Sequence, residues 1–373
     1  MKIVLIGKYN ESELLNGPEK VAKRLFENIR LINSDTVFIE YFFKYSGKSS
    51  FFLRLFGSRE LYKSTNVKTL GILPLFFYLI KNQPDVIHFV TEERFQASIF
   101  LYKLFLKSKI FITAHGLLRY EASHLKTKPS LYSRLKIKLL EFLLLKFSDR
   151  IVFVSKKLMD FSLNYYKLDL NKIVIIPNGV DKIFFNETPK FVPEKSIKIV
   201  LYCGDIKDSN IVERLKLIFD NTISQKKIEI FVIAKAVFED YFTDWLAIRF
   251  SPAISAPELA EFLRDKDLYL NINNYESFSI FALECMASGI IPIVSKEVGM
   301  SSYIQNGSSG FILSCDDAAA AAEELKNVVR DLIENKKYDF SLISRNASKI
   351  AEELNWSKIS CKYMDLYKAL INE

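Results

Sequence analysis

Two glutamates, Glu276 and Glu284, are the acidic residues whose spacing says most about chemistry. Seven residues separate them in the segment ESFSIFALECMASGIIPIVS, which has the pattern of a loop followed by a helix that begins near Ser279. The first backbone N–H groups of a helix have no partner inside it and lie at the positive end of its dipole. We therefore expect the amides of Ser279, Ile280 and Phe281 to form a phosphate site.

Carboxylates on either side of such a phosphate suit recognition of hydroxyl groups. Glu276 lies in the loop, and Glu284 lies about one turn inside the helix, on the opposite side of the phosphate. Carboxylate oxygens only accept hydrogen bonds, so one acid can bind sugar hydroxyls and the other ribose hydroxyls. The same spacing also fits a turn acid followed by a surface acid of a helix, and the motif alone leaves both interpretations open.

Short β-rich apolar runs alternate with longer helical patterns along the chain. Strands are expected near 2–6, 36–42, 85–90, 109–114, 150–154, 173–176, 197–202, 228–233, 247–250, 268–272 and 291–294. Helices are expected near 18–32, 69–82, 95–107, 130–147, 156–166, 209–223, 256–264, 279–288, 317–335 and 340–353. This alternation is typical of an α/β protein with parallel sheets covered by helices on both faces.

The length of 373 residues, 49% of them hydrophobic, predicts two domains, since single cores stop growing at roughly 250–300 residues. We expect an N-terminal domain over 1–180 and a C-terminal domain over 197–355. The segment 181–196 contains two prolines and mixed charge that interrupt both periodicities, which indicates a linker. Residues 356–373 have helical apolar spacing and one face that needs a partner.

Four segments together resemble the family 4 glycosyltransferases, which retain anomeric configuration. They are NGPEKVAKRL at 16–25, ITAHG at 112–116, the stretch from SDRIVFVS to PNGVD at 148–181, and the stretch from YESFSIFALECMASG to GFIL at 275–313. The resemblance implies the GT-B fold, with two Rossmann-like domains facing across a cleft and the C-terminal helix returning to the N-terminal domain. It also implies a bacterial surface-polysaccharide or O-antigen type of enzyme.

The resemblance assigns roles to particular residues. It implies that Gly17 lets the backbone approach the donor diphosphate, that Ser279, Ile280, Phe281 and Glu284 bind the donor, and that His115 and Glu276 act at the transferred sugar. A lone histidine at a strand end also fits a structural residue, and His88 and His124 are expected to be structural because no motif supports them.

The chain also departs from the family pattern beside the diphosphate. Asp205 stands where an arginine is usual and Asn210 where a lysine is usual, which removes two cations from the leaving group. Lys207 or Lys235 could compensate, although each also fits a solvated surface lysine; we assign Lys207 to the donor site. The alternative is a catalytically weak relative that acts as an accessory subunit or chaperone.

No metal or other cofactor is expected, because helix N-termini and basic groups hold the diphosphate in this family. The sequence Asp265–Lys266–Asp267 would suit a metal, but it joins a predicted helix to a buried strand, where a charged turn is ordinary. A dehydrogenase is disfavoured because no G-x-G-x-x-G follows the first strand. An epimerase or phosphorylase on the same fold stays open, since fold does not determine function.

The positive charge of the chain lies in its first half. Residues 1–180 contain 29 Lys and Arg against 15 Asp and Glu, and residues 119–147 mix lysines with leucines and aromatics. Such a basic amphipathic helix suits an anionic membrane surface, although a core helix with a solvated basic face has the same pattern. Apolar runs are too short to span a bilayer. We expect a cytoplasmic protein, peripheral at the inner face of the cell membrane, with no nucleic-acid partner.

The resulting prediction is a metal-independent retaining glycosyltransferase. Its donor is expected to be a nucleotide diphosphate sugar, namely a UDP-sugar carrying a hexosyl or N-acetylhexosaminyl group. Its acceptor is expected to be a lipid-linked or surface glycan.

Overall fold

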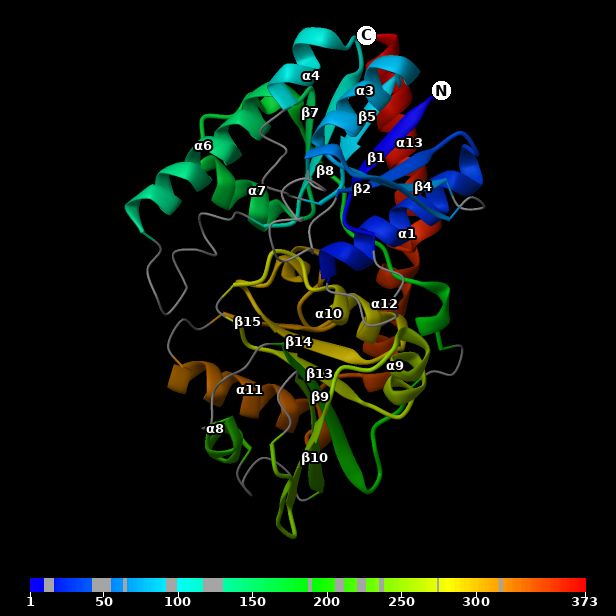
Figure 1. Ribbon diagram of the computed structural model, residues 1–373. Helices are drawn as coiled ribbons and strands as arrows, with labels where there is room; N and C mark the ends of the chain where they lie inside the picture. Colours follow the sequence, from blue (N-terminus) through cyan, green and yellow to red (C-terminus); the bar gives the residue numbers. More distant parts are fainter. Residues whose placement is uncertain are drawn as a thin grey trace. The chain divides into compact units, whose positions relative to one another are not determined.

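The computed structural model describes residues 1–9, 17–41, 55–62, 66–91, 99–116, 130–186, 190–204, 211–219, 226–234, 238–273, 275–314 and 318–373. The chain divides into two compact units (Figure 1). Unit 1 comprises Met1–Asn178 and Trp356–Glu373, and unit 2 comprises Gly179–Asn355. Each unit is built on one sheet.

The sheet of unit 1 has the strand order β3-β4-β2-β1-β5-β6-β7-β8. Its strands are β1 (Ile3–Gly7), β2 (Val37–Tyr41), β3 (Ser58–Tyr62), β4 (Val67–Leu70), β5 (Val86–Phe89), β6 (Lys109–Ala114), β7 (Arg150–Phe153) and β8 (Ile173–Ile175). Every neighbouring pair is parallel except the antiparallel pair of β3 and β4. The order reverses at β1 and β5, which makes their carboxyl ends the switch point of the sheet.

Helices cover both faces of this sheet. The helices of unit 1 are α1 (Gly17–Ile32), α3 (Ile72–Asn82), α4 (Ile99–Phe105), α6 (Leu131–Phe147), α7 (Lys156–Leu163) and α13 (Trp356–Asn372), with the short helix η2 (Leu170–Lys172). Successive side chains of a strand point to opposite faces. In β5, Phe89 stacks on Tyr102 of α4, whereas His88 contacts Tyr367 of α13 on the other face. The C-terminal helix is therefore an integral layer of unit 1.

The sheet of unit 2 has the order β11-β12-β10-β9-β13-β14-β15. Its strands are β9 (Ser196–Gly204), β10 (Lys227–Ala234), β11 (Tyr241–Phe242), β12 (Leu246–Ser251), β13 (Leu268–Asn271), β14 (Ile291–Ser295) and β15 (Phe311–Leu313). Only the pair of β11 and β12 is antiparallel in this sheet. The order reverses between β9 and β13, so the switch point of unit 2 lies at their carboxyl ends.

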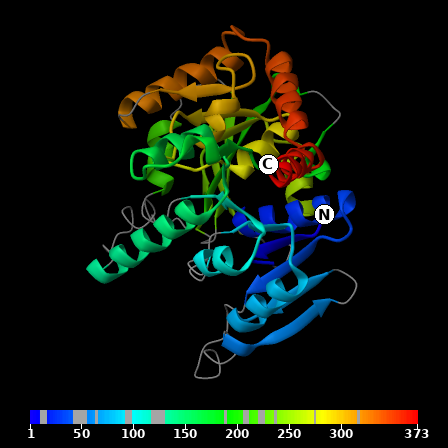
Figure 2. The ribbon, with the colours of Figure 1, turned by 90° about the horizontal axis from the view of Figure 1, so that it is seen from above.

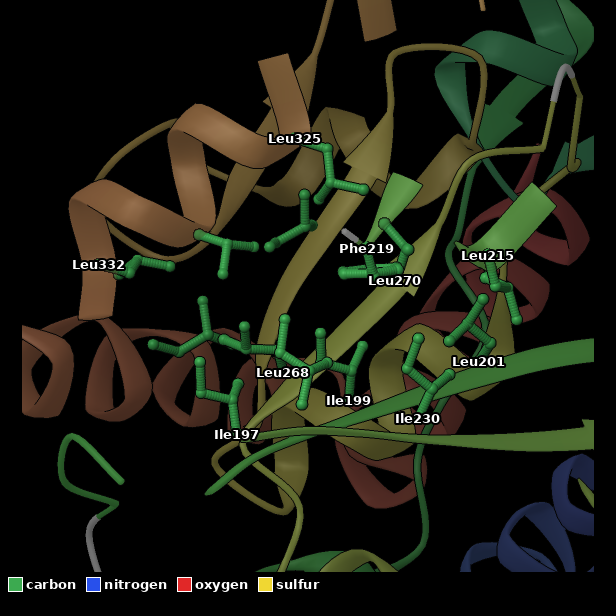
Figure 3. Packing of buried hydrophobic residues seen from close by; sticks show 14 of the residues in the cluster. Ile197, Ile199, Leu201, Leu215, Phe219, Ile230, Leu268, Leu270, Leu325 and Leu332 are labelled. Carbon is green, nitrogen blue, oxygen red and sulfur yellow. The ribbon is translucent and has the colours of Figure 1, made fainter. Parts of the chain in front are cut away.

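Unit 2 also has helices on both faces. They are α8 (Ile211–Ile218), α9 (Ala256–Leu263), α10 (Ile280–Ala287), α11 (Ala318–Ile333) and α12 (Phe340–Glu353), with η3 (Lys182–Phe184) and η4 (Gly299–Tyr303). On one face, strand residues such as Ile199 and Leu268 pack with Leu215 of α8 and Leu332 of α11 (Figure 3). On the other face, Phe231 contacts Phe262 of α9, and Phe281 of α10 contacts Tyr269.

The α/β class with two doubly wound parallel sheets is confirmed by these topologies. One predicted boundary is wrong: the helix expected over 69–82 begins at Ile72, and Val67–Leu70 forms β4 before it. The β-branched Val67 and Thr69 favour a strand, and Gly71 then separates the two elements as the N-cap of α3. Strands β3, β11 and β15 were not expected.

The segment 181–196, expected to be a linker, is part of unit 2. Lys190 is buried, and its Nζ donates to the carbonyl oxygens of Leu263 (3.4 Å), Arg264 (2.5 Å) and Lys266 (2.6 Å). These carbonyls lie at the C-terminal end of α9 and just after it, where a helix presents acceptors and the negative end of its dipole. The buried ammonium therefore attaches this part of the segment to unit 2.

Candidate functional site

The candidate site of unit 2 lies in the segment that leaves the carboxyl end of β13. This end is at the switch point of the sheet, which is where open α/β sheets bind ligands. The segment passes through Glu276 and enters α10 with Ser279 as the N-cap. The helix start expected near Ser279 is confirmed to within one residue.

A glycine that the sequence analysis did not single out holds this segment in place. Gly299 donates its N–H to the Glu276 carbonyl (2.8 Å), and Met300 donates to the Phe278 carbonyl (2.8 Å). A Cβ atom on residue 299 would lie 2.1 Å from the Ser277 carbonyl oxygen, a separation that no side chain can occupy. Only glycine therefore allows η4 to pack against the backbone of Glu276–Phe278.

The Glu276 carboxylate is held by neutral hydrogen-bond donors. Its Oε2 accepts from Asn271 Nδ2 at 2.5 Å, and the side chains of Ser279 and Asn273 also hydrogen-bond to it. Burial raises the pKa of Glu276, and these hydrogen bonds oppose that rise. No lysine or arginine in the described parts of the chain forms an ion pair with this carboxylate. Its remaining lone pairs suit hydroxyl donors.

The first turn of α10 presents backbone donors beside this carboxylate. Ser279 Oγ accepts from Ala282 N at 3.4 Å and caps the helix. The N–H groups of Ser279, Ile280 and Phe281 form no hydrogen bond with described residues. Unpaired N–H groups at the positive end of a helix dipole can bind an anion such as a phosphate.

Glu284 lies about one turn further along α10 and is only 3% exposed. Its burial excludes the alternative of a solvent-exposed helix acid. A carboxyl group rarely lies inside a protein without partners. Burial raises the pKa of the neighbouring Cys285 thiol, and the negative charge of Glu284 adds to this rise. Its burial makes Glu284 a candidate for a specific polar role.

An aromatic stack adjoins the helix start. The rings of Phe281 and Tyr202 are stacked, with centroids 5.3 Å apart and planes at 26°, and Phe281 also contacts the buried Tyr269. Tyr202 lies near the carboxyl end of β9 and is 42% exposed. The switch point of unit 2 thus combines a carboxylate, backbone N–H donors and an aromatic surface.

His115 lies in unit 1, directly after β6. Its Nε2 is 2.8 Å from the Val90 carbonyl oxygen, so this nitrogen carries the proton, because a carbonyl only accepts. Burial lowers the pKa of His115 to about 4, so the ring is neutral near pH 7. Its Nδ1 forms no hydrogen bond with the described part of the chain. The ring therefore offers a hydrogen-bond acceptor.

His88, expected to be structural, is fully buried and hydrogen-bonded within unit 1. Gly17 is the first residue of α1, and Glu19 is buried in the first turn of that helix. The remaining residues of interest, Lys207, Lys235, Asp205, Asn210 and His124, lie outside the described residues. Their predicted roles stay predictions.

The described ranges contain no cluster of side chains suited to bind a metal ion. No group of three or more His, Cys, Asp and Glu side chains there is placed to hold an ion. Asp265 pairs with Lys198 (Oδ2 to Nζ, 2.7 Å) and with Lys266, and Asp267 accepts from the Lys198 N–H at 2.8 Å. These acids stabilise the turn between α9 and β13.

Two family models match segments of the chain. Glycosyltransferase Family 4 matches residues 56–182, and Glycosyl transferases group 1 matches residues 246–343. An uncharacterized glycosyltransferase of Methanocaldococcus jannaschii is 27% identical over 237 residues, 60% of each chain. A GDP-mannose:cellobiosyl-diphosphopolyprenol alpha-mannosyltransferase of Komagataeibacter xylinus is 24% identical over 34% of this chain and 31% of the relative. The matches thus span less than two thirds of these curated relatives.

Solved structures show the same fold. Sucrose-phosphate synthase from Thermosynechococcus elongatus superposes with a TM-score of 0.70 and 16% identity, with 100% of both chains covered. Anabaena HepE in complex with UDP superposes with a TM-score of 0.67 and 13% identity, covering 99% of this chain and 100% of HepE. The fold of this chain is therefore GT-B, and the family matches support a glycosyltransferase.

Proposed function

We propose that this chain is a GT-B glycosyltransferase that transfers a sugar from a nucleotide diphosphate sugar to a lipid-linked or surface glycan acceptor, with retention and without a metal. The observation that carries the proposal is the arrangement at the switch point of unit 2. There the Glu276 carboxylate, held by neutral donors, adjoins the unpaired N–H groups of Ser279, Ile280 and Phe281. The two family matches support the reaction class.

In this proposal the N–H groups of α10 bind the donor diphosphate and stabilise the charge that develops on it as the glycosidic bond breaks. Preorganised N–H dipoles do this without reorganisation in the transition state. Glu276 accepts hydrogen bonds from the transferred sugar, and the buried Glu284 accepts hydrogen bonds from the ribose. In unit 1, the neutral His115 offers Nδ1 as an acceptor for a hydroxyl donor.

A UDP-sugar is the proposed donor. HepE has been crystallised with UDP and with UDP-glucose, so this fold accommodates that ligand in a related structure. The mannosyltransferase relative is named for a GDP-mannose donor, which makes the base a matter for direct test. That relative is also named for a diphosphopolyprenol acceptor, in agreement with a lipid-linked acceptor here.

We further propose that unit 1 binds an anionic membrane surface through the exposed side of α6. Leu131, Leu135, Leu139 and Phe142 are each at least 46% exposed, and their spacing places them along one side of the helix. The exposed Lys138 and Lys146 lie on the same helix, and α6 extends outwards from the sheet of unit 1 (Figure 2). Apolar side chains with adjacent lysines are typical of helices that lie in a membrane interface. Within the described residues, no helix is both long and apolar enough to span a bilayer.

A screen of nucleotide sugars tests the proposal. Purified protein is incubated with UDP-, GDP-, ADP- and dTDP-sugars, and slow donor hydrolysis is measured with the change in melting temperature. We expect one nucleotide class to stabilise the protein and one sugar of that class to be hydrolysed. Stabilisation without any turnover, with or without a lipid-linked acceptor, would instead support the accessory-subunit alternative.

A further inference from the structure

A buried amide side chain, that of Asn271, lies at the centre of the polar contacts in unit 2. Asn271 is the last residue of β13 and is 4% exposed. Its Nδ2 lies 2.5 Å from Glu276 Oε2, 2.9 Å from the Tyr269 hydroxyl and 3.3 Å from Ser279 Oγ. One amide group thus contacts the carboxylate, the helix cap and a buried phenol.

The orientation of this amide is determined by the backbone. The Asn273 N–H donates to Asn271 Oδ1 at 3.1 Å, so the amide oxygen of Asn271 faces the Asn273 N–H. The opposite orientation would place the amide oxygen against the Glu276 carboxylate and its NH₂ group against the Asn273 N–H, both unfavourable. The N–H donors of Asn271 are therefore directed at Glu276.

The backbone of Ser279 is also unusual and depends on these contacts. Its φ of 80° lies in the left-handed region, which is disfavoured for any residue with a Cβ atom. Its hydroxyl lies 3.3 Å from both Asn271 Nδ2 and the Tyr269 hydroxyl, and it accepts from Ala282 N. The contacts that orient Glu276 therefore also hold the first residue of the phosphate site.

We propose that Asn271 is a positioning residue of the donor site. It orients the Glu276 carboxylate toward the sugar of a nucleotide sugar and fixes that carboxylate relative to the N-terminus of α10, which receives the diphosphate. The inference rests on the proposed function for the identity of the ligand, and on the hydrogen bonds of Asn271 for the geometry. Its consequence is that Asn271 affects recognition of the sugar more than recognition of the nucleotide.

Two variants separate positioning from folding. Asn271→Ala removes the donors, and Asn271→Asp keeps the shape of the side chain but opposes Glu276 with a second carboxylate. Asn346→Asp is the matched control, because Asn346 Nδ2 donates to the Ser308 carbonyl at 3.0 Å in the same unit and does not contact the site. Comparable melting temperatures for the control and the Asn271 variants would show that the unit is folded.

The first measurement needs no ligand. Crystal structures of the parent and of Asn271→Ala are compared at Glu276 and Ser279. We expect the Glu276 carboxylate to move away from its position in the parent, while the first turn of α10 stays in place. An unchanged position of the Glu276 carboxylate would overturn the proposal, whatever the chain binds.

The second measurement uses UDP and UDP-glucose as probes. Calorimetric affinities give the dissociation constant of UDP divided by that of UDP-glucose. This ratio isolates the contribution of the sugar. We expect both Asn271 variants to reduce this ratio by about tenfold or more, because a carboxylate that is no longer oriented loses its hydrogen bonds to the sugar, while UDP affinity changes little. Equal weakening of both probes would reduce Asn271 to a structural residue. A parent that binds neither probe would contradict the proposed UDP-sugar donor, and the crystal structures would then decide the role of Asn271 alone.

Discussion

His88 Nδ1 lies 2.5 Å from the hydroxyl of Tyr367, and the two residues are 279 positions apart in the chain. The other ring nitrogen, Nε2, lies 2.8 Å from Thr113 Oγ1, which in turn lies 3.2 Å from the Tyr363 hydroxyl. Both tyrosines belong to α13. A neutral imidazole has one donor and one acceptor, so it satisfies both neighbours inside the sheet-helix interface. This network connects α13 to the central strands β5 and β6 of unit 1.

The network makes stability depend on pH. Burial lowers the pKa of His88 from 6.5 to about 3, so between these values the unfolded chain binds a proton that the folded chain does not. The contribution is therefore fully present above pH 6.5 and is lost as the pH falls toward 3, with a limiting slope of about 1.4 kcal/mol per pH unit. We expect His88→Gln to flatten the fall in unfolding free energy between pH 6 and 4.5, measured by urea denaturation.

Comparison with the parent protein is essential, because other groups titrate in the same range. His115, with a pKa of about 4, acts in the same direction. Burial raises the pKa of Asp267 to about 6, and this group adds stability at low pH that is lost as the pH rises through 6. If the free energy of unfolding falls with pH equally in His88→Gln and in the parent, His88 does not contribute to the loss of stability in acid.

Most of the fold could be predicted from local patterns, and the exceptions have identifiable causes. Strand β14 (IPIVS) is an apolar run that is buried on both faces, and α13 has apolar residues at helical spacing, so both were recognisable. Strand β4 was assigned in part to the following helix because apolar residues continue from Leu70 into α3. Strand β3 (SRELY) contains charged residues and pairs at a sheet edge, where a local pattern is weakest.

The candidate site was predictable where it follows from spacing along the chain. Glu276, Ser279 and Glu284 belong to one loop-helix segment, and the helix cap formed where expected. Asn271 and Gly299 were missed because their roles arise from contacts with that segment after folding, and an amide at a strand end has no distinctive local pattern. The lone glycine after β14 was the available signal for Gly299.

Substitutions of Ser279 test the strain at the start of α10. In Ser279→Gly, relief of the left-handed conformation (about 1–2 kcal/mol) is offset by the lost cap and by the greater freedom of glycine in the unfolded chain, about 0.5–1 kcal/mol. We expect its unfolding free energy to lie within about 1 kcal/mol of the parent. Ser279→Ala keeps the strain and loses the hydrogen bonds, so it should cost about 1–2 kcal/mol. Equal losses for both variants in denaturant titrations would argue against backbone strain.

The two glutamates should separate in their effects on binding and turnover. Glu284→Ala should reduce the rise in melting temperature produced by a nucleoside diphosphate, because its proposed partner is the ribose. Glu276→Ala should lower turnover far more than nucleotide affinity, because its proposed partner is the sugar. Thermal shift and initial-rate measurements on both variants check this division. An unchanged shift in Glu284→Ala, or equal losses of both quantities in Glu276→Ala, would contradict it.

Chelation tests the proposed metal independence. The diphosphate is proposed to bind the N–H groups of Ser279, Ile280 and Phe281, and these dipoles are expected to supply the charge stabilisation. EDTA should therefore leave the initial rate of donor turnover within about twofold of the untreated rate. The control is addition of Mg²⁺ or Mn²⁺ to the chelated enzyme. Loss of activity that either ion restores would overturn the metal-free mechanism.

The proposed membrane surface combines two interactions that respond differently to salt. Each lysine or arginine near an anionic bilayer contributes about 1 kcal/mol, and the attraction decays within a Debye length of roughly 10 Å at 0.1 M salt. The exposed leucines of α6 add apolar burial, which salt does not screen. We therefore expect co-sedimentation with anionic vesicles that weakens as salt rises and a smaller, salt-resistant fraction that Leu135→Ser with Leu139→Ser removes.

Replacing Lys126, Lys128, Arg134, Lys136 and Lys138 together by glutamine should abolish the salt-sensitive part of this binding. Nucleotide affinity should stay unchanged, because all five belong to unit 1, whereas the α10 N–H groups and Glu284, proposed to bind the diphosphate and the ribose, belong to unit 2. Lys126 and Lys128 lie outside the described residues, and Lys138 is exposed on α6. The matched control replaces five exposed lysines of unit 2 by glutamine, so that net charge falls equally. These lysines are Lys182, Lys195, Lys227, Lys336 and Lys349. If both variants lose vesicle binding to the same extent, net charge rather than this surface is responsible. If neither the parent nor the variants sediment with anionic vesicles at low salt, the membrane proposal is wrong.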